Sequence, residues 1–299
     1  MNLEGIFSYE DFLNEVIDED NKKPVDYRSP LIWYGGKFHI VDEILKYMPE
    51  HQCYVEPFFG SGQVFFKKPK AMVEVINDID LNVYNFFKVL SNESLFNEFI
   101  KKVYLLYAHR KIFEEQRRVM ESDNVNIVDK AVALFYRVYL GFNARVYCNS
   151  YATGTEINKA MNLNSAKRRL FFAHERLRDV FVECKDWKEI VKQYDSNDAF
   201  IYLDPPYLQD VRKTFNDYKH EMSKEQHQEL VDILLTLKSK VMLSGYANPV
   251  YEKLEQQGWM RIDIDTYCWV TNAKQTNGVK DKRIESLWIN YQVPKLKLF

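Results

Sequence analysis

The sequence predicts an α/β fold built on an open sheet. The prediction depends on three short apolar strands that run into turns rich in acids, glycines or prolines. These strands end near Glu56, Asp78 and Asp204, and segments with helical spacing of apolar residues follow the first two directly. Ligands of open α/β sheets bind at the carboxyl ends of the strands. The three turns are therefore the first candidates for a functional site.

The size and composition of the chain are those of an ordinary globular protein. Its 299 residues are 46% hydrophobic and 28% charged, which predicts one large domain, alone or with a smaller one. The sequence has no run of eighteen apolar residues, and it begins with the acidic segment Met1–Glu4. We therefore expect neither a membrane span nor a signal peptide, and we take the cytoplasm as the compartment.

The cysteines and histidines do not predict a metal site. Cys53, Cys148, Cys184 and Cys268 are far apart, form no CxxC pair and have no zinc-finger spacing to the six histidines. We therefore expect reduced cysteines, and we assign no metal ligand.

The strand Ile201–Leu203 leads into the most informative motif, Asp204–Tyr207, with the sequence DPPY. Two successive prolines cannot extend a sheet ladder or enter a helix, so the strand must end at Asp204. The rigid turn holds a carboxylate and a carbonyl side by side next to an aromatic ring, which suits the planar amino group of a nucleobase. A plain Pro-Pro turn with a surface tyrosine is the simpler alternative, and the other motifs count against it.

Two glycine-containing turns precede this motif. Trp33–Lys37 places two glycines beside a lysine, and Glu56–Gly62 places small residues between a strand and a helix. A ligand can lie against the backbone at such turns. The second turn lacks both the GxxxxGK[ST] spacing of a phosphate loop and the third glycine of a dinucleotide loop, so ATP and NAD are disfavoured.

Acids also end two further strands. Asp78 and Asp80 end the strand that begins at Val73; one of them can accept both hydroxyls of a ribose while the other caps the next helix. Asp186 ends the strand that begins at Phe181 and precedes a helix. The sequence leaves open which of Asp78 and Asp80 takes which role.

The remaining elements are expected from periodicity and turn residues. Residues 82–178 have mainly helical spacing, and Ser223 with Gln226 forms a capping box that begins another helix. The further expected elements are a strand at 241–245, a helix at 249–257 and a terminal strand pair at 259–270 and 284–291.

The middle of the chain is basic, although the net charge of the whole chain is −2. Residues 101–178 hold 15 lysines and arginines against 7 acids, and a polar, aromatic stretch at 141–155 interrupts the helical pattern. Such a surface suits phosphates and base edges; a solvated helical surface with a plain connecting loop is the alternative. The candidate nucleic-acid contacts are Arg110, Arg118, Asn143, Arg145, Tyr147, Asn149, Tyr151, Lys167, Arg168 and Lys213.

The motifs Trp33–Lys37, Glu56–Gly62 and Asp204–Tyr207, in this order, resemble the Dam-type family of DNA adenine-N6 methyltransferases, in its alpha group. That group places the cofactor loop first, the target-recognition region next and DPPY last. The resemblance covers about residues 30–292. DPPY alone also resembles the NPPY of protein-glutamine methyltransferases and the SPPY of cytosine-N4 enzymes, and the aspartate favours adenine.

The resemblance implies a Rossmann-like methyltransferase fold, with a mixed seven-stranded sheet, helices on both faces and a mainly helical target-recognition insertion. It implies S-adenosylmethionine as cofactor and duplex DNA as partner. A cognate restriction endonuclease and a monomer or weak dimer are compatible with it, and no membrane or metal is expected. The implied division is an amino-terminal extension at 1–28, a catalytic domain at 29–90 and 179–299, and a DNA-binding target-recognition region at 91–178.

Matched position by position to these motifs, the resemblance also assigns the site residues. The catalytic residues are Asp204, Pro205, Pro206 and Tyr207. The cofactor-binding residues are Trp33, Tyr34, Gly35, Lys37, Glu56, Pro57, Phe58, Gly60, Gly62, Asp78, Ile79, Asp186, Trp187 and Asp204.

The implied chemistry explains the catalytic motif. The amino group of adenine is a weak nucleophile because its lone pair is delocalised. The Asp204 carboxylate and the Pro205 carbonyl can accept its hydrogens and localise that lone pair. Tyr207 is placed to stack on a flipped base, so we expect Tyr207→Phe to retain most activity and Tyr207→Ala to lose it. An RNA adenine-N6 methyltransferase and an inactive DNA-binding protein of this fold are the alternatives.

Overall fold

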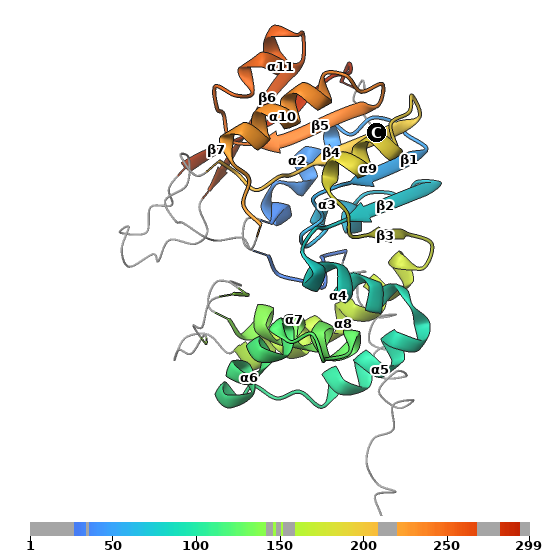
Figure 1. Ribbon diagram of the computed structural model, residues 1–299, viewed down its shortest axis with the longest axis vertical. Helices are drawn as coiled ribbons and strands as arrows, with labels where there is room; N and C mark the ends of the chain where they lie inside the picture. The colour runs from blue at the N-terminus through green and yellow to red at the C-terminus, as the bar shows by residue number, and fades with distance from the viewer. Residues whose placement is uncertain are drawn as a thin grey trace, which may run out of the picture.

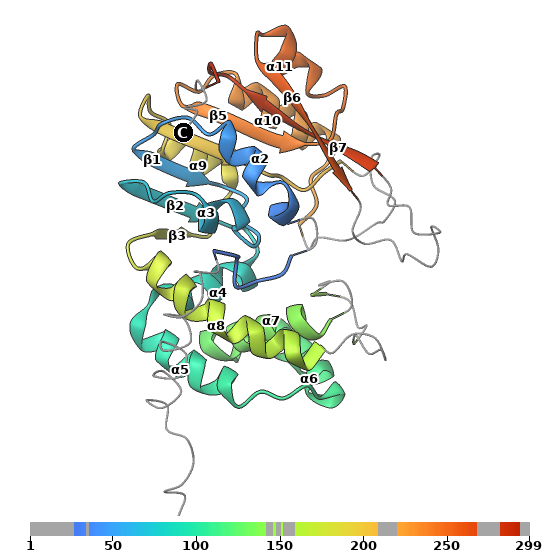
Figure 2. The ribbon, with the colours of Figure 1, turned by 180° about the vertical axis from the view of Figure 1, so that it is seen from behind.

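The computed structural model describes residues 27–33, 36–141, 146–147, 151, 159–208, 220–267 and 282–293. A sheet with flanking helices forms one half of the molecule, and a group of helices forms the other half, as two opposite views show (Figures 1 and 2). The expectations for residues 1–26, Tyr34, Gly35, Asn143, Arg145, Asn149 and Lys213 lie outside the described residues.

The sheet has seven strands in the order β3-β2-β1-β4-β5-β7-β6. Its first five strands are parallel, and β7 pairs antiparallel with both β5 and β6. This mixed sheet and its terminal strand pair confirm the prediction. The strands are β1 (Cys53–Glu56), β2 (Val73–Asn77), β3 (Phe181–Glu183), β4 (Ala199–Leu203), β5 (Lys240–Gly245), β6 (Met260–Tyr267) and β7 (Lys282–Ile289).

Helices cover both faces of the sheet, as expected (Figures 1 and 2). On one face lie η1 (Lys37–His39), α2 (Val41–Lys46) and α3 (Gln63–Lys67), and on the other lie α9 (Trp187–Gln193), α10 (Lys224–Leu234) and α11 (Glu252–Gln256). Alternation along β4 sends Phe200 and Tyr202 to the first face and Ile201 and Leu203 to the second. The expected capping box begins α10. Helix α11 is shorter than expected because residues 249–251 form a turn.

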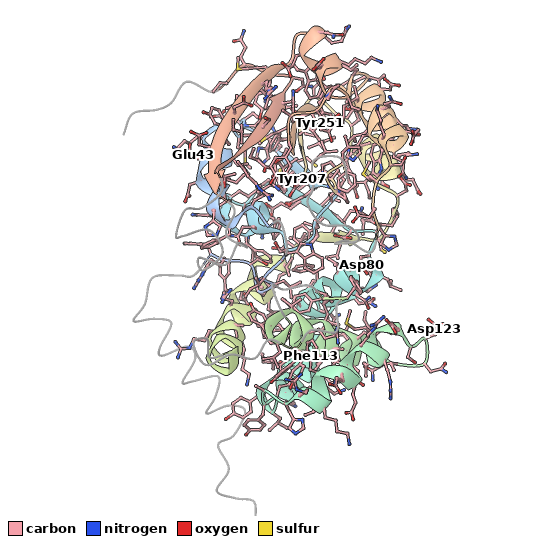
Figure 3. The ribbon with its side chains drawn as sticks, turned by 90° about the vertical axis from the view of Figure 1, so that its left-hand side faces the viewer. Glu43, Asp80, Phe113, Asp123, Tyr207 and Tyr251 are labelled. Atoms are coloured by element: carbon pink, nitrogen blue, oxygen red, sulfur yellow. The ribbon has the colours of Figure 1, made fainter. Side chains whose placement is uncertain are left out.

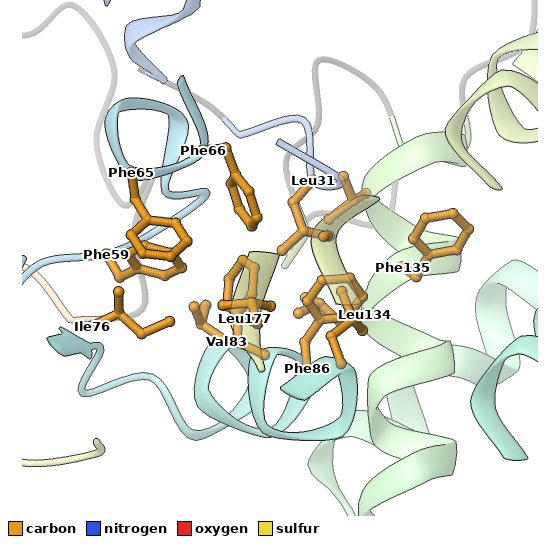
Figure 4. Packing of buried hydrophobic residues seen from close by; sticks show 14 of the residues in the cluster. Leu31, Phe59, Phe65, Phe66, Ile76, Val83, Phe86, Leu134, Phe135 and Leu177 are labelled. Atoms are coloured by element: carbon orange, nitrogen blue, oxygen red, sulfur yellow. The ribbon is translucent and has the colours of Figure 1, made fainter. Parts of the chain in front are cut away.

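The helical half consists of α4 (Leu81–Ser91), α5 (Glu93–Tyr104), α6 (Arg110–Glu121), α7 (Ile127–Leu140) and α8 (Lys159–Leu177). Helix α4, which ends at the expected domain boundary near residue 90, packs along α7 and α8. One apolar core runs from Phe59 and Phe66 through Phe86 of α4 to Leu134 of α7 (Figure 4). The helical half therefore shares its core with the sheet. Within the described ranges, no helix is both long and apolar enough to cross a bilayer.

Candidate active site

A cavity of about 420 Å³ opens at the carboxyl ends of β1, β2 and β4. The strand order reverses between β1 and β4, which is where doubly wound sheets bind their ligands. Its volume lies within the roughly 300–1,000 Å³ typical of small-molecule sites. The structure brings many of the predicted residues to its walls, namely Trp33, Lys37, Glu56, Pro57, Phe58, Gly60, Gly62, Asp78, Ile79, Asp186, Trp187, Asp204 and Pro206.

The turn after β1 is shaped by its glycines. Gly60 and Gly62 have φ values of +51° and +67°, in the left-handed region that favours glycine. A Cβ atom on Gly62 would lie 2.2 Å from the ring of Phe59, which is itself buried in the core. Only glycine therefore allows this turn to close over Phe59 and leave its outer surface to a ligand.

Asn77, at the end of β2, ties the turns around the cavity together. Its amide group donates to the carbonyls of Pro57 and Lys185 at 2.9 and 3.1 Å, and its oxygen accepts from the Lys185 amide at 2.9 Å. The sequence reasoning missed this role. A buried asparagine that ends a strand is a visible signal, but its partners lie 20 and 108 positions away.

The structure separates the roles of Asp78 and Asp80. Asp80 is the N-cap of α4, where it accepts from the Asn82 amide at 3.0 Å, and it also accepts from the hydroxyl of Tyr147. Asp78 lines the cavity and accepts from the amides of Gly60 and Asp80, each at 2.8 Å. Burial and the neighbouring Asp80 raise the pKa of Asp78 to about 7. A carboxylate accepts about four hydrogen bonds, so Asp78 has capacity for a ligand.

Glu56 forms the end of β1 and is almost fully buried in the cavity wall. The hydroxyl of Tyr54 donates to its Oε2 at 2.7 Å. Burial is the main reason why the pKa of Glu56 rises to about 8, and the nearby Asp204 carboxylate adds to the rise. At neutral pH this side chain is therefore mainly protonated.

Asp204 lies in a cluster of charged and polar groups. Lys37 is buried, and its Nζ donates to Asp204 Oδ1 at 2.7 Å and to the Tyr207 hydroxyl. The Tyr207 hydroxyl in turn donates to Glu285 of β7, which lies 3.4 Å from Lys37 Nζ. Burial raises the pKa of Asp204; Lys37 opposes the rise and Glu285 adds to it.

The sequence reasoning also missed Glu285, because it lies far along the chain in a strand that it identified only by its apolar pattern. Tyr207 and Pro205 belong to the predicted motif, yet the walls of the cavity are formed by Asp204 and Pro206 instead. The hydroxyl of Tyr207 is engaged with Lys37 and Glu285, and its ring packs edge-on against Tyr246.

A buried relay supports the DPPY turn from behind. Nε2 of His227, on α10, lies 3.0 Å from the carbonyl oxygen of Pro206, and the hydroxyl of Tyr251 lies 2.7 Å from its Nδ1. The carbonyl can only accept, so Nε2 carries the proton and the Tyr251 hydroxyl donates to Nδ1. His227 is fully buried.

Aromatic and apolar side chains also line the cavity. The rings of Phe58 and Trp187 have centroids 6.0 Å apart, and the partly exposed side chain of Ile79 lies on the same cavity lining. Asp186 caps α9 by accepting from the Lys188 amide at 2.9 Å. Among the described residues, no group of His, Cys, Asp or Glu side chains could hold a metal ion.

The predicted nucleic-acid contacts are placed in three different ways. Arg110 and Arg118 of α6 and Arg168 of α8 are exposed, and the guanidinium of Arg110 lies 4.9 Å from the ring centre of Tyr151. Lys167 is buried, and its ammonium donates to the carbonyl of Tyr104 at 3.1 Å. Tyr147 lines the cavity and donates to Asp80, so it is placed at the predicted cofactor side instead.

A side view relates these positions to the two halves of the molecule. Tyr207 lies within the sheet half, Asp80 lies near the junction of the two halves, and Phe113 lies within the helical half (Figure 3). Phe113 packs beneath Tyr151, with ring centroids 5.3 Å apart. The exposed arginines of α6 therefore share the helical half with an aromatic group and lie apart from the cavity.

The fold, the glycine turn and the acid-lined cavity beside DPPY define a methyltransferase of the doubly wound type. A family model for D12 class N6 adenine-specific DNA methyltransferases matches residues 33–265, and the chain belongs to this family. The resemblance found in the sequence is thereby confirmed, and so is the predicted class of enzyme.

Relatives of this chain share about a quarter of its residues. It is 26% identical over 275 residues to the Type II methyltransferase M1.LlaDCHI of Lactococcus lactis subsp. cremoris, which covers 87% of this chain and 92% of that protein. It is 27% identical over 235 residues to a DNA adenine methylase of Haemophilus influenzae, covering 75% and 79%. It is 25% identical over 247 residues to the DNA N-6-adenine-methyltransferase of Escherichia phage P1, covering 79% of this chain and 32% of that protein.

Proposed function

We propose that this enzyme transfers a methyl group from S-adenosylmethionine to N6 of an adenine flipped out of duplex DNA. The observation that carries the proposal is the position of Asp204. Its carboxylate lines the cavity and is 22% exposed. Lys37 Nζ lies 2.7 Å from one of its oxygens and fixes it in place. An acceptor that is both fixed and accessible is what the target amino group requires.

The residues around the cavity fit S-adenosylmethionine. The rings of Phe58 and Trp187 suit its adenine, and Asp78 has acceptor capacity for the two ribose hydroxyls. The turn at Gly60 and Gly62 would hold the methionine part close to the backbone. When bound, this molecule supplies an activated methyl group on a sulfonium.

Asp204 and Pro205 then activate the target. The carboxylate accepts one hydrogen of the adenine amino group. Pro205 does not itself line the cavity, but its carbonyl follows Asp204 in the same turn, and we assign the other hydrogen to it, so that the nitrogen lone pair turns toward the methyl group. The nitrogen becomes more positive as the bond forms, so these contacts strengthen in the transition state. Because burial raises the pKa of Asp204, its carboxylate is suited to take up the proton that N6 releases.

The helical half supplies the surface for DNA. Arg110, Arg118 and Arg168 are exposed, and guanidinium groups bind phosphates through paired hydrogen bonds. Because the helices share one core with the sheet, a duplex held by these arginines keeps a fixed position relative to the cavity. The target adenine must leave the base stack to reach it.

The experiment is transfer of labelled methyl groups from S-adenosylmethionine to unmethylated duplex DNA, with Asp204→Ala and Asp198→Ala as variants. Asp198 is exposed and directly precedes the opposite end of the same strand, so it is a matched control. We expect label on adenine N6, a loss of at least about 10²–10³-fold for Asp204→Ala, and wild-type rates for Asp198→Ala. Label on RNA in preference to DNA, or no transfer despite cofactor binding, would contradict the proposal.

A further inference from the structure

The carboxylate of Glu285 is buried at the far side of the catalytic motif. It belongs to β7, is 4% exposed, and accepts hydrogen bonds from the Tyr207 hydroxyl and from Ser244 Oγ, the latter at 3.0 Å. Lys37 Nζ lies 3.4 Å away. Burying a carboxylate is costly unless it is paired, and a strand of the sheet needs only apolar side chains at such a position. Glu285 has no role in the methyl transfer as described so far.

The arrangement of charges suggests one. A single ammonium group lies between two carboxylates, at 2.7 Å from Asp204 and at 3.4 Å from Glu285. A carboxylate that is fully neutralised by its own lysine is a weak acceptor for a further hydrogen bond. A second carboxylate that draws part of the lysine's charge leaves more negative charge on the first.

The hydrogen bonds point to a second effect of the same residue. Tyr207 ends the catalytic turn, and its hydroxyl is bound by Lys37 on one side and Glu285 on the other. These two contacts, together with the packing against Tyr246, fix the ring of Tyr207 and the end of the turn.

We propose that Glu285 is a positioning residue for methyl transfer, which shares Lys37 with Asp204 and anchors the hydroxyl of Tyr207. This role rests on the proposed function, and Glu285 itself does not contact the substrate. It acts through Asp204, whose carboxylate stays a strong acceptor for the adenine amino group, and through Tyr207, whose ring stays in place beside that carboxylate. Tyr207→Phe should therefore impair catalysis, in contrast to the expectation from the sequence.

The pH dependence gives a readout that a purely structural role would not change. Removing the negative charge of Glu285 should lower the pKa of Asp204, because Glu285 is one of the groups that raise it. Asp204 accepts hydrogens only when ionised, so the acidic limb of the rate profile should move to lower pH. The titratable groups that face Asp204 are Lys37 of η1, Glu56 of β1, Tyr202 of β4, Tyr207 of the catalytic turn, Tyr251 before α11 and Glu285 of β7.

The experiment compares Glu285→Gln with the wild type in single-turnover methylation of duplex DNA at saturating cofactor, from pH 5 to 9. Glutamine keeps an acceptor for Tyr207 and Ser244 but removes the charge. We expect the plateau rate to fall roughly 10-fold, as for loss of a charge-assisted contact, with the acidic limb shifted to lower pH. The matched control is Glu255→Gln, which alters an acid that accepts from Trp288 outside the cavity and should shift neither.

A double variant separates the two effects. Glu285→Ala removes the acceptor of the Tyr207 hydroxyl as well as the charge. If Glu285 and Tyr207 act through their shared contact, Tyr207→Phe combined with Glu285→Ala should lose much less than the product of the single losses. Unchanged plateau and limb in Glu285→Gln, a limb moved to higher pH, or fully multiplicative losses would overturn the inference while wild-type methylation leaves the proposed function standing. No methylation by the wild type would overturn both.

Discussion

Two buried clusters of charge lie at opposite ends of the parallel strands and have opposite compositions. At the amino ends of the strands, Lys68 and Arg176 surround one carboxylate, Glu74, and link α3, β2 and α8. At the carboxyl ends, Asp204 and Glu285 share one ammonium, that of Lys37. The first cluster has an excess of cations and is sealed by the core; the second has an excess of acids and borders the cavity.

The pKa values show what this difference does. Burial alone would raise the pKa of Glu74, but Arg176 and Lys68 together bring it below its usual value. The pKa values of Asp78, Glu56 and Asp204 are all raised, with burial as the largest cause. The carboxylate of the scaffold is thus saturated with donors, whereas the acids of the site are short of them. Ribose hydroxyls and an adenine amino group are donors that could complete them.

The largest expected effect of a substitution is on the scaffold cluster. Glu74→Ala leaves two buried cations without their partner, so we expect a loss of about 3–5 kcal/mol in the free energy of unfolding. Chemical denaturation measures it. Asp179→Ala is the control, because it removes the exposed partner of Lys70, and exposed ion pairs contribute little to stability, so its loss should be far smaller. Equal losses in the free energy of unfolding would mean that the buried cluster stabilises the protein no more than an exposed ion pair does.

In the active site, replacing a buried acid should increase the free energy of unfolding instead of lowering it. The pKa of Glu56 is about 8 in the fold and about 4.5 in the unfolded chain, so folding retains a proton that the unfolded chain releases. Stability therefore falls as pH rises between these two values. We expect Glu56→Gln, which mimics the protonated acid, to match the wild type near pH 4.5 and to exceed its stability by roughly 2–4 kcal/mol at pH 8.

Thermal or chemical unfolding across this pH range measures the difference. Glu56→Ala is the comparison, because it deprives Tyr54 of its acceptor and should lose part of that gain. A stability difference that does not change with pH would contradict the raised pKa and, with it, the contrast between the two clusters.

The sequence predicted much of the sheet and the cavity, and the reason is local. The prolines after Asp204 end a strand wherever they occur, and glycines with left-handed φ values mark the turn at Gly60 and Gly62. Asp78 and Asp80 show the limit of such reasoning. Both are good caps by type, and only the amide positions show that Asp80 caps α4 while Asp78 borders the cavity.

The sequence could not predict contacts that depend on tertiary packing. Glu285 is 81 positions from Asp204 along the chain, and only the insertion of β7 beside β5 brings it to Tyr207. In the sequence, Lys167 is a cation followed by two arginines, as expected of a phosphate contact. It is nevertheless buried, and its ammonium donates to the carbonyl of Tyr104 at the end of α5. The sequence shows that a helix carries a lysine, but not whether its side chain points to solvent or into the protein.

A smaller effect tests whether the cavity acids are short of donors. The pKa of Asp78 is about 7, and a ribose diol binds better to the ionised form. Cofactor affinity should therefore fall as pH decreases through 7, by about tenfold between pH 8 and pH 6. Isothermal titration of S-adenosylmethionine without DNA measures it. Asp78→Asn should bind more weakly with little pH dependence over this range, whereas the same slope in that variant would assign the titration to another group.

The smallest expected effect concerns a neutral hydrogen bond at the border between scaffold and site. Tyr251→Phe removes the donor to His227 Nδ1, so the imidazole no longer has to carry its proton on the nitrogen that faces Pro206. We expect a loss of about 1 kcal/mol in stability and roughly a fivefold fall in single-turnover rate. Tyr291→Phe removes a partly buried hydrogen bond, to the carbonyl of Tyr47, and neither residue lines the cavity. Tyr291→Phe should reduce stability by a similar amount and leave the rate unchanged. Equal rates in the two variants would mean that the hydrogen bonds of His227 contribute to stability but not to catalysis.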